Sequence, residues 1–400
     1  MNVIFVIHQD FSSPSGMHVF HLANELEKLG VRCATYSPGW AETVSRYGKP
    51  LFRAFDTRVQ PQDFLAETAF PEGETIIHCW TPRETPRLLV EKLTASYAAP
   101  VIVHMEDNEE AITEAHLEDL SAGERESESL WRPGSHYFSL SHPARHREFL
   151  AAADGYTCII ESLLDFKPDA VPGHVFWPSC EPEVFDIPLA SSAEEKKRWD
   201  IGPDEKVVFY PGNLHPNNAD EVIQLYAAIA HLRARGLPIR IIKFGQYSPA
   251  VMRMFGEIPG LSGAIVDLTE RIAPKDVPTV MRAADVLVQP GRDDAFNRYR
   301  FPSKLPLFMA SGRPVILPKS NLGEHLTHGE NCLLLRDADS CSEEIAAHIL
   351  DLAGNPEKAA AIGTAGREFA RRHFSWKASA EGLKTFYETI LAARREGHPS

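Results

Sequence analysis

Residues 300–315 read Arg300-Phe301-Pro302-Ser303-Lys304-Leu305-Pro306-Leu307-Phe308-Met309-Ala310-Ser311-Gly312-Arg313-Pro314-Val315. Pro302 suits the first turn of a helix, because its ring already fixes the backbone angle that a helix needs. Gly312 then ends the short helix before a new apolar strand. Arg300 and Lys304 add two cations at the helix start. We therefore interpret this segment as a phosphate-binding corner of an α/β domain.

The surrounding sequence alternates apolar runs with helical stretches. One helix is expected over residues 219–235, where Val222, Tyr226 and Ile229 form an apolar stripe at helical spacing. Alternation of this kind predicts a parallel sheet with helices on both faces. The expected strands are residues 207–210, 239–244, 264–267, 286–289, 315–317 and 332–335.

The first half of the chain repeats the pattern. A helix is expected over residues 18–29, and Gly30 ends it. The chain has 400 residues, more than the roughly 250–300 at which a single core stops growing, so two domains are expected. We place them at residues 1–180 and 205–375, with the proline-containing stretch 181–204 as the linker. The expected strands are residues 2–7, 32–36, 75–79, 100–104, 155–160 and 174–177.

Composition narrows the function classes. A formal net charge of −14 argues against nucleic acid as a partner. No segment has about 20 consecutive apolar residues, and the first residues read as a strand rather than a signal peptide, so a cytoplasmic protein is expected. The six cysteines are scattered and are expected to be reduced thiols. The histidines of this sequence do not form a cluster with the spacing of metal ligands, so no metal site is expected.

Two further segments point to a known family. Gly329-Glu330-Asn331-Cys332-Leu333-Leu334-Leu335 and Arg372-His373-Phe374-Ser375-Trp376, together with residues 300–315, resemble the donor domain of retaining glycosyltransferases of family 4, also called glycosyl transferases group 1. This resemblance implies the GT-B fold, in which two Rossmann-like α/β domains face each other across a cleft. It also implies that a last helix, residues 376–396, crosses back onto the first domain.

The resemblance implies a reaction as well. A sugar would pass from a nucleoside-diphosphate sugar to an acceptor hydroxyl with retention of configuration, and without a metal or other cofactor. The acceptor would be a glycan, a lipid-linked sugar or a small-molecule glycoside. A lipid-linked acceptor would bring the protein to the inner face of the membrane as a peripheral protein.

In the first domain, two residues are candidates for contacting the sugar. Gly16 opens the helix after the first strand, where a glycine lets the backbone approach a ligand. Taken alone, it is an ordinary turn residue as readily as a ligand contact. His104 stands at the carboxyl end of a buried strand, the edge at which doubly wound sheets bind ligands, although a histidine there also serves as a plain strand-end residue. The family has a histidine facing the sugar in the matching motif, so His104 is the leading catalytic candidate.

In the second domain, the candidates would hold the donor diphosphate. Arg300 and Lys304 would neutralise the departing phosphates, with Ser303 at the helix start and Lys243, a lysine inside an apolar strand, as a third cation. Taken alone, Arg300 and Lys304 also fit a solvated helix start, and a lysine inside an apolar strand is either paired or faces a ligand. Asn213 and Asn218 stand where the family has an arginine and a lysine. These two asparagines would still hydrogen-bond phosphate, or would simply form a turn that caps a helix.

The sequence departs from the family at a further pair of positions. The Glu-x7-Glu motif of the family falls on Tyr299 and Leu307, so both carboxylates are absent. The second of them binds the ribose hydroxyls in the family. Asp293 and Asp294, just upstream, would substitute in part. These departures keep two other hypotheses open: a degenerate GT-B protein that binds a nucleotide or a partner without transferring sugar, and a nucleotide-sugar epimerase.

Overall fold

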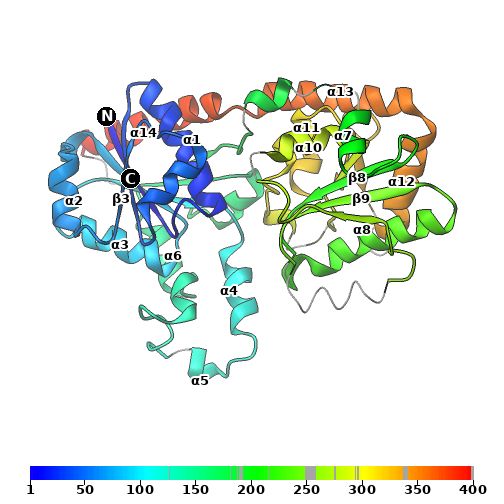
Figure 1. Cartoon of the computed structure of the whole chain (residues 1–400). Coiled ribbons are helices and arrows are strands. Elements are labelled where there is room, and N and C mark those ends of the chain that lie inside the picture. The colour runs from blue at the N-terminus through cyan, green and yellow to red at the C-terminus, as the bar shows by residue number, and fades with distance from the viewer. Residues whose placement is uncertain are drawn as a thin grey trace. The chain divides into compact units, whose positions relative to one another are not determined.

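The computed structural model describes residues 1–125, 127–180, 182–186, 188, 192–214, 216–247, 258–273, 276–292, 294, 297–336 and 341–397. The chain forms two compact units, coloured mainly blue to green and green to orange in Figure 1. The first unit comprises Met1–Pro178, Tyr299–Phe301 and Ser375–Ser400, and the second comprises Ser179–Arg298 and Pro302–Phe374.

A parallel sheet forms the centre of the first unit. Within the described residues it has seven strands in the order β3-β2-β1-β4-β5-β6-β7. From β1 the chain builds outward to β2 and β3, then returns to the other side of β1 to begin β4. The order therefore reverses between β1 and β4, and such a switch point is where doubly wound sheets bind ligands. The strands are β1 (Asn2–Ile7), β2 (Arg32–Ser37), β3 (Arg53–Asp56), β4 (Thr75–Trp80), β5 (Val101–Met105), β6 (Gly155–Cys158) and β7 (Gly173–Val175).

Helices cover the sheet of the first unit, and α4 and α5 extend away from it (Figure 1). Short 3-10 segments, η1 (Ala41–Tyr47), η2 (Glu72–Glu74), η3 (His136–Ser139) and η4 (Glu161–Phe166), connect several elements. The helices are α1 (Pro14–Lys28), α2 (Pro61–Thr68), α3 (Glu84–Thr94), α4 (Glu109–Leu117), α5 (Ala122–Arg125), α6 (Arg145–Ala151) and α14 (Trp376–Arg395).

The last helix, α14, is part of the first unit although it lies at the other end of the sequence. It packs along α1, as the red and blue helices in Figure 1 show. Its buried face carries Trp376, Leu383, Tyr387 and Ile390, which join the core formed by β1 and α1. The prediction that the C-terminal helix returns to the first domain is therefore confirmed.

The second unit has a parallel sheet of the same kind. Its described strands follow the order β10-β9-β8-β11-β12-β13, so the switch point lies between β8 and β11. The strands are β8 (Lys206–Pro211), β9 (Ile239–Phe244), β10 (Ile265–Asp267), β11 (Val286–Val288), β12 (Val315–Pro318) and β13 (Leu333–Leu335). The helices are α7 (Ala193–Arg198), α8 (Pro216–Ala234), α10 (Val277–Val280), α11 (Leu305–Ala310), α12 (Cys341–Gly354) and α13 (Pro356–His373). Short 3-10 segments are η5 (Pro182–Asp186), η7 (Met281–Ala283), η8 (Asn297–Tyr299) and η9 (Asn321–His325).

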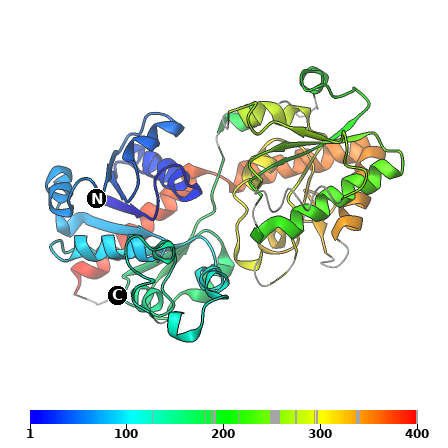
Figure 2. The same ribbon diagram turned by 60° about the horizontal axis from the view of Figure 1, so that its bottom comes forward.

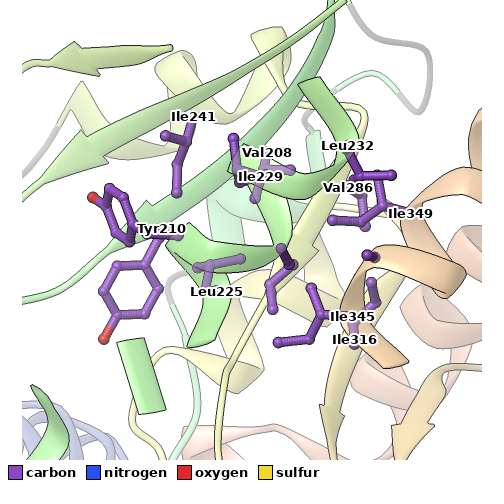
Figure 3. Close-up of a cluster of buried hydrophobic side chains, with 14 of the residues drawn as sticks. Val208, Tyr210, Leu225, Ile229, Leu232, Ile241, Val286, Ile316, Ile345 and Ile349 are labelled. Carbon is purple, nitrogen blue, oxygen red and sulfur yellow. The ribbon is translucent and has the colours of Figure 1, made fainter. Parts of the chain in front are cut away.

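One core cluster holds α8 and α12 against the sheet of the second unit (Figure 3). Leu225 and Ile229 of α8 and Ile345 of α12 are fully buried over the strands. Figure 2, turned from the first view, shows the long green helix α8 lying along this sheet.

The predicted elements correspond to observed ones, with shifted ends. The helix expected over residues 18–29 begins earlier, at Pro14, because the Ser13 side chain caps it by accepting a hydrogen bond from the Gly16 amide at 3.1 Å. Strand β3 was missed, because Arg53–Asp56 has only four residues and carries a charged residue at each end. The stretch expected as a linker, residues 181–204, lies in the second unit and contains α7.

A substitution at Gly363 tests how closely α13 packs in the second unit. A Cβ atom on Gly363 would overlap the carbonyl oxygen of Gly312, whereas one on Gly354, at the end of α12, would meet nothing within 4 Å. Gly363→Ala should therefore lower the free energy of unfolding by about 1–3 kcal/mol through overpacking. Gly354→Ala should cause no loss. Urea unfolding followed by circular dichroism measures both, and equal midpoints for the two variants would contradict this packing.

Candidate functional site

Polar side chains gather at the carboxyl ends of β1, β4 and β5 in the first unit. His8 follows β1, Thr81 follows β4, and Glu106 and Asp107 follow β5. The sheet order reverses between β1 and β4, so this edge is the expected ligand-binding edge. Among the described residues, His8 Nδ1 and Thr81 Oγ1 are buried with no hydrogen-bond partner. Buried polar atoms without partners are rare in folded proteins, which marks this edge as a candidate ligand site.

Glu106 joins the β5 end to the start of α1. Its carboxylate accepts a hydrogen bond from the Ser15 hydroxyl, and its other oxygen lies 2.7 Å from His18 Nδ1. Burial alone would raise the pKa of Glu106, but the bonds with His18 and Ser15 hold that pKa below its usual range. Glu106 is therefore an ionised carboxylate that orients His18, whose Nε2 is buried with no partner among the described residues.

His104 is completely buried on β5. Its Nδ1 lies 2.8 Å from the hydroxyl of Thr157, and its ring packs against Trp80 with 3.9 Å between ring centroids. Burial lowers the pKa of His104 to about 3, so the ring is neutral at physiological pH. Its Nε2 is buried and has no partner among the described residues. A neutral imidazole with one unmatched nitrogen suits a hydrogen bond to a hydroxyl rather than the binding of a phosphate.

Charged residues surround Asp107. Arg83 donates to the Glu109 carboxylate at 3.0 and 3.1 Å, and Ser141 donates to the same carboxylate at 2.8 Å. Burial raises the pKa of Asp107 to about 7, although the positive charge of Arg300 acts in the opposite direction. Arg300 thus lies with the first unit, near the end of β5.

Gly16 lies in the first turn of α1, the position that the sequence predicted. A Cβ atom there would lie 2.5 Å from Phe11 Cα and 2.7 Å from the Asp10 carbonyl oxygen. The glycine is therefore required by the close packing of the β1–α1 loop on the helix. This packing accounts for the residue, and its contact with a sugar stays a prediction.

In the second unit, the turn after β8 carries both asparagine candidates. The Asn213 side chain accepts a hydrogen bond from the Gln246 amide at 2.9 Å, and Asn218 donates to the Asn213 carbonyl at 3.0 Å. Gly245 has φ +127°, and a Cβ atom on it would overlap the Gly212 carbonyl. The two loops after β8 and β9 are thus held together tightly, and both asparagines have structural bonds there.

Lys304 lies against this turn. A Cβ atom on Gly212 would be only 2.9 Å from the Lys304 ammonium, which also sits 4.7 Å from the centre of the Tyr210 ring. The absence of a side chain on Gly212 gives the ammonium its place at the carboxyl end of β8, next to the switch point of the sheet. Ser303 is exposed in the turn before α11. The structure therefore brings together Lys304, Asn213 and Asn218 but places Arg300 in the first unit.

Lys243 on β9 is buried, and its charge is matched. Its ammonium is 2.7 Å from Asp267 and 2.9 Å from the Thr269 hydroxyl, and it lies 4.0 Å from the centre of the Tyr247 ring. Burial would raise the pKa of Asp267, but the bonds from Lys243 and Thr269 hold it below its usual value. The observed contacts give Lys243 a structural role, and its binding of a donor stays a prediction.

The residues around the missing carboxylates have other contacts. The Tyr299 hydroxyl donates to Asp165 at 3.0 Å within the first unit. Leu307 is on α11 and is half-buried. Asp294 is exposed and accepts a hydrogen bond from the Asn297 amide at 2.8 Å. Asp293 lies outside the described residues.

Sequence reasoning gave no role to several residues of these edges. His8, His18 and Arg83 were not singled out, and neither was Arg292, which follows β11 in the second unit. Arg292 Nε is buried and has no partner among the described residues. The signal was available in part, because Arg292 lies in the short loop after an apolar strand, as His104 ends one.

No three His, Cys, Asp or Glu side chains in the described part of the chain lie close enough together to hold a metal ion. No helix there has the length and apolar character needed to cross a membrane.

Comparison with known proteins identifies relatives. Residues 205–355 match the family model described as glycosyl transferases group 1. D-inositol 3-phosphate glycosyltransferase of Rhodococcus erythropolis is 28% identical over 204 residues, which cover 49% of this chain and 44% of that protein. The GDP-mannose-dependent alpha-(1-6)-phosphatidylinositol monomannoside mannosyltransferase of Mycolicibacterium smegmatis is 26% identical over 236 residues, 58% of this chain and 59% of that protein. The chain thus spans about half the length of the curated relatives it matches.

Solved structures resemble the chain over nearly all its length. Sucrose-phosphate synthase from Thermosynechococcus elongatus has a TM-score of 0.69 and 16% identity, covering 98% of this chain and 100% of that one. HepE from Anabaena in complex with UDP and glucose has a TM-score of 0.69 and 14% identity, covering 96% and 99%. At these identities the likeness shows the fold. It confirms the predicted GT-B class, and the family match confirms the predicted resemblance to glycosyl transferases group 1.

Asp107 gives a testable dependence of stability on pH. Its pKa is raised from 3.8 to about 7 in the folded protein, so folding makes it bind its proton more tightly. Its contribution to stability is therefore complete below pH 3.8 and is lost as the pH rises to about 7. Asp107→Asn removes this titration. The free energy of unfolding of the wild type minus that of the variant should decrease between pH 4 and pH 7. Urea unfolding at several pH values measures the difference, and a constant or rising difference would contradict the assignment.

Proposed function

We propose that this chain, which resembles glycosyl transferases group 1 and has the GT-B fold, transfers a sugar from a nucleoside-diphosphate sugar to an acceptor hydroxyl with retention of configuration. Three observations support the proposal. They are the family match over residues 205–355, the fold shared with HepE, whose structures include complexes with UDP and UDP-glucose, and the polar residues at the switch points of both sheets.

The observation that carries the proposal is the position of Lys304. Its ammonium lies beside Gly212 at the carboxyl end of β8, where a doubly wound sheet binds nucleotides. A diphosphate leaving group gains negative charge as the bond to the sugar breaks, and a fixed cation at that place stabilises it. Asn213 and Asn218 would hydrogen-bond the phosphates without adding charge. Ser303 and Asp294 are proposed to contact the nucleotide, and Arg300 to be the second cation.

In the first unit, His104 is proposed to face the sugar. Its neutral ring has one unmatched buried nitrogen, which suits a sugar hydroxyl better than a phosphate. Gly16 would let the loop after β1 approach the same sugar. His104 therefore orients the sugar, whereas Lys304 stabilises the leaving group.

The partners follow from this reaction. The donor is a nucleoside-diphosphate sugar, and the acceptor is a carbohydrate or a lipid-linked sugar. Two curated relatives carry inositol phosphate or phosphatidylinositol mannoside in their names, which supports a hydroxyl-rich acceptor of this kind. A lipid-linked acceptor would entail peripheral contact with a membrane. The reaction as proposed needs no metal and no other cofactor.

A second candidate function is binding of a nucleotide without transfer. It is favoured by Tyr299 and Leu307, which stand where the family has carboxylates, and by the bond from Tyr299 to Asp165. Incubating the protein with nucleotide sugars and a panel of glycoside acceptors separates the two. Release of nucleoside diphosphate with a new glycoside of unchanged anomeric configuration, seen by proton NMR, supports transfer. Tight binding with no product from any acceptor supports the second candidate.

Lys304→Ala tests the donor site. Loss of the cation should weaken the binding of the nucleoside diphosphate about tenfold or more, because a hydrogen bond to a charged group contributes about 1.5–3 kcal/mol. Isothermal titration calorimetry measures the affinity. Lys358→Ala is the matched control, since Lys358 is exposed, pairs with Asp351 and lies on α13. Equal affinities for Lys304→Ala and the wild type would remove Lys304 from the site.

A further inference from the structure

A chain of hydrogen bonds crosses the buried face of the first sheet and ends at His104. The hydroxyl of Tyr387 on α14 lies 2.6 Å from His78 Nδ1. His78 Nε2 lies 2.9 Å from the Thr157 hydroxyl, which is 2.8 Å from His104 Nδ1. All four side chains are completely buried. They come from α14, β4, β6 and β5, and we refer to them as the relay.

The register of the sheet explains why these side chains meet. Trp80 is paired with His104, and His104 is paired with Thr157, across β4, β5 and β6. His78 lies two residues before Trp80 on β4, so it points to the same face. α14 lies against this unit and brings Tyr387 to the end of the row.

The protons of the relay can be counted. Burial lowers the pKa of both histidines, that of His78 well below its usual value and that of His104 to about 3, so each ring carries one N–H. Tyr387 and Thr157 add one O–H each. Four protons therefore serve three hydrogen bonds, so one proton has no acceptor within the relay. It is the proton of His104 Nε2, that of Tyr387 or, if Thr157 accepts from both histidines, that of Thr157.

The direction follows from Tyr387. Among the described residues, its hydroxyl has His78 Nδ1 as its one hydrogen-bond partner. If Tyr387 donates to His78, then His78 donates to Thr157, Thr157 donates to His104 Nδ1, and the fourth proton is on His104 Nε2. If the relay ran the other way, the Tyr387 proton would be buried without an acceptor, and His104 Nε2 would be an unmatched acceptor as well. If instead Thr157 accepted from both histidines, its own proton would be buried without an acceptor among the described residues, and His104 Nε2 would again be an unmatched acceptor. In either alternative the extra unmatched hydroxyl disfavours the arrangement by about tenfold or more.

We propose that Tyr387, through His78 and Thr157, holds His104 in the tautomer with its proton on Nε2. The buried Nε2–H at the end of β5 is then a hydrogen-bond donor, and it takes an oxygen acceptor such as a ligand hydroxyl or ring oxygen. Tyr387, His78 and Thr157 are positioning residues, because they act on a ligand only through His104. The C-terminal helix thus determines the chemistry of a residue 283 positions earlier in the chain, from 104 to 387.

This tautomer decides what His104 can do. A neutral ring with Nε2 protonated donates a hydrogen bond, and its Nδ1 lone pair is already occupied by Thr157. His104 therefore has no free lone pair with which to remove a proton from an acceptor hydroxyl. The identification of the acceptor oxygen with a sugar rests on the proposed function, whereas the tautomer does not.

The tautomer can be measured on the ligand-free protein. Long-range proton–nitrogen NMR of protein labelled with ¹⁵N-histidine distinguishes Nε2–H from Nδ1–H, and the resonance lost in His104→Gln identifies the residue. We expect the wild-type His104 to have Nε2 protonated by a factor of about ten or more over the other tautomer. Thr157→Val and Tyr387→Phe should each reduce that ratio by about tenfold, because each removes a donor from the relay.

Matched controls lie in the same unit. Thr35→Val removes a completely buried hydroxyl that has no hydrogen-bond partner among the described residues. Tyr36→Phe removes a tyrosine hydroxyl that donates a hydrogen bond to the Val59 carbonyl at 2.7 Å. Neither should change the His104 tautomer. Nδ1–H in the wild type would overturn the proposal without any variant. An unchanged ratio in Thr157→Val and Tyr387→Phe would overturn it as well. Absence of sugar transfer would count against the proposed function and leave this result standing.

Discussion

Each unit depends on a parallel sheet that is buried on both faces. Strands in such a sheet are apolar along their length, so polar groups collect at the strand ends. β1 is buried at every residue. The first polar side chain with a candidate role, that of His8, follows directly after the strand ends. The sheet order then decides which of these ends lie together. In both units the order reverses next to a strand whose following loop carries candidate residues.

Departures from this rule are informative. His78, His104 and Thr157 are polar and lie inside buried strands, where an unmatched polar group is costly. The relay satisfies all their hydrogen-bonding atoms except His104 Nε2. Lys243 is a similar departure in the second unit, but there Asp267 and Thr269 satisfy the ammonium. The contrast separates a buried polar residue that is structurally complete from one that has an atom left for a ligand.

Much of the fold could be predicted from the sequence, because alternating apolar and helical periods report local structure directly. The apolar run at residues 239–244 and the stripe on the helix near Val222 correspond to β9 and α8. β3 was missed because Arg53–Asp56 carries charges at both ends. The return of α14 to the first unit was expected from the family resemblance and not from any local pattern.

The candidate site was harder to predict, because a residue type does not reveal its partners. Lys243 and Lys304 are both lysines near the same sheet, yet Asp267 neutralises the first, and the second lies beside the Gly212 turn. Arg300 and Lys304 are four residues apart but are assigned to different units. The relay could not be read from the sequence, since its members are separated by up to 309 positions and meet only through the register of the sheet and the packing of α14.

We propose above all that the second unit binds a nucleoside diphosphate at the end of β8. Thermal unfolding of the protein with UDP, GDP, dTDP, ADP and CMP, each alone and as its sugar, tests it most directly. A ligand at about 100 times its dissociation constant adds about 2.7 kcal/mol of stability, which raises the midpoint by several degrees. One nucleoside diphosphate and its sugar should raise the midpoint selectively. An unchanged midpoint with every nucleotide at millimolar concentration would contradict it.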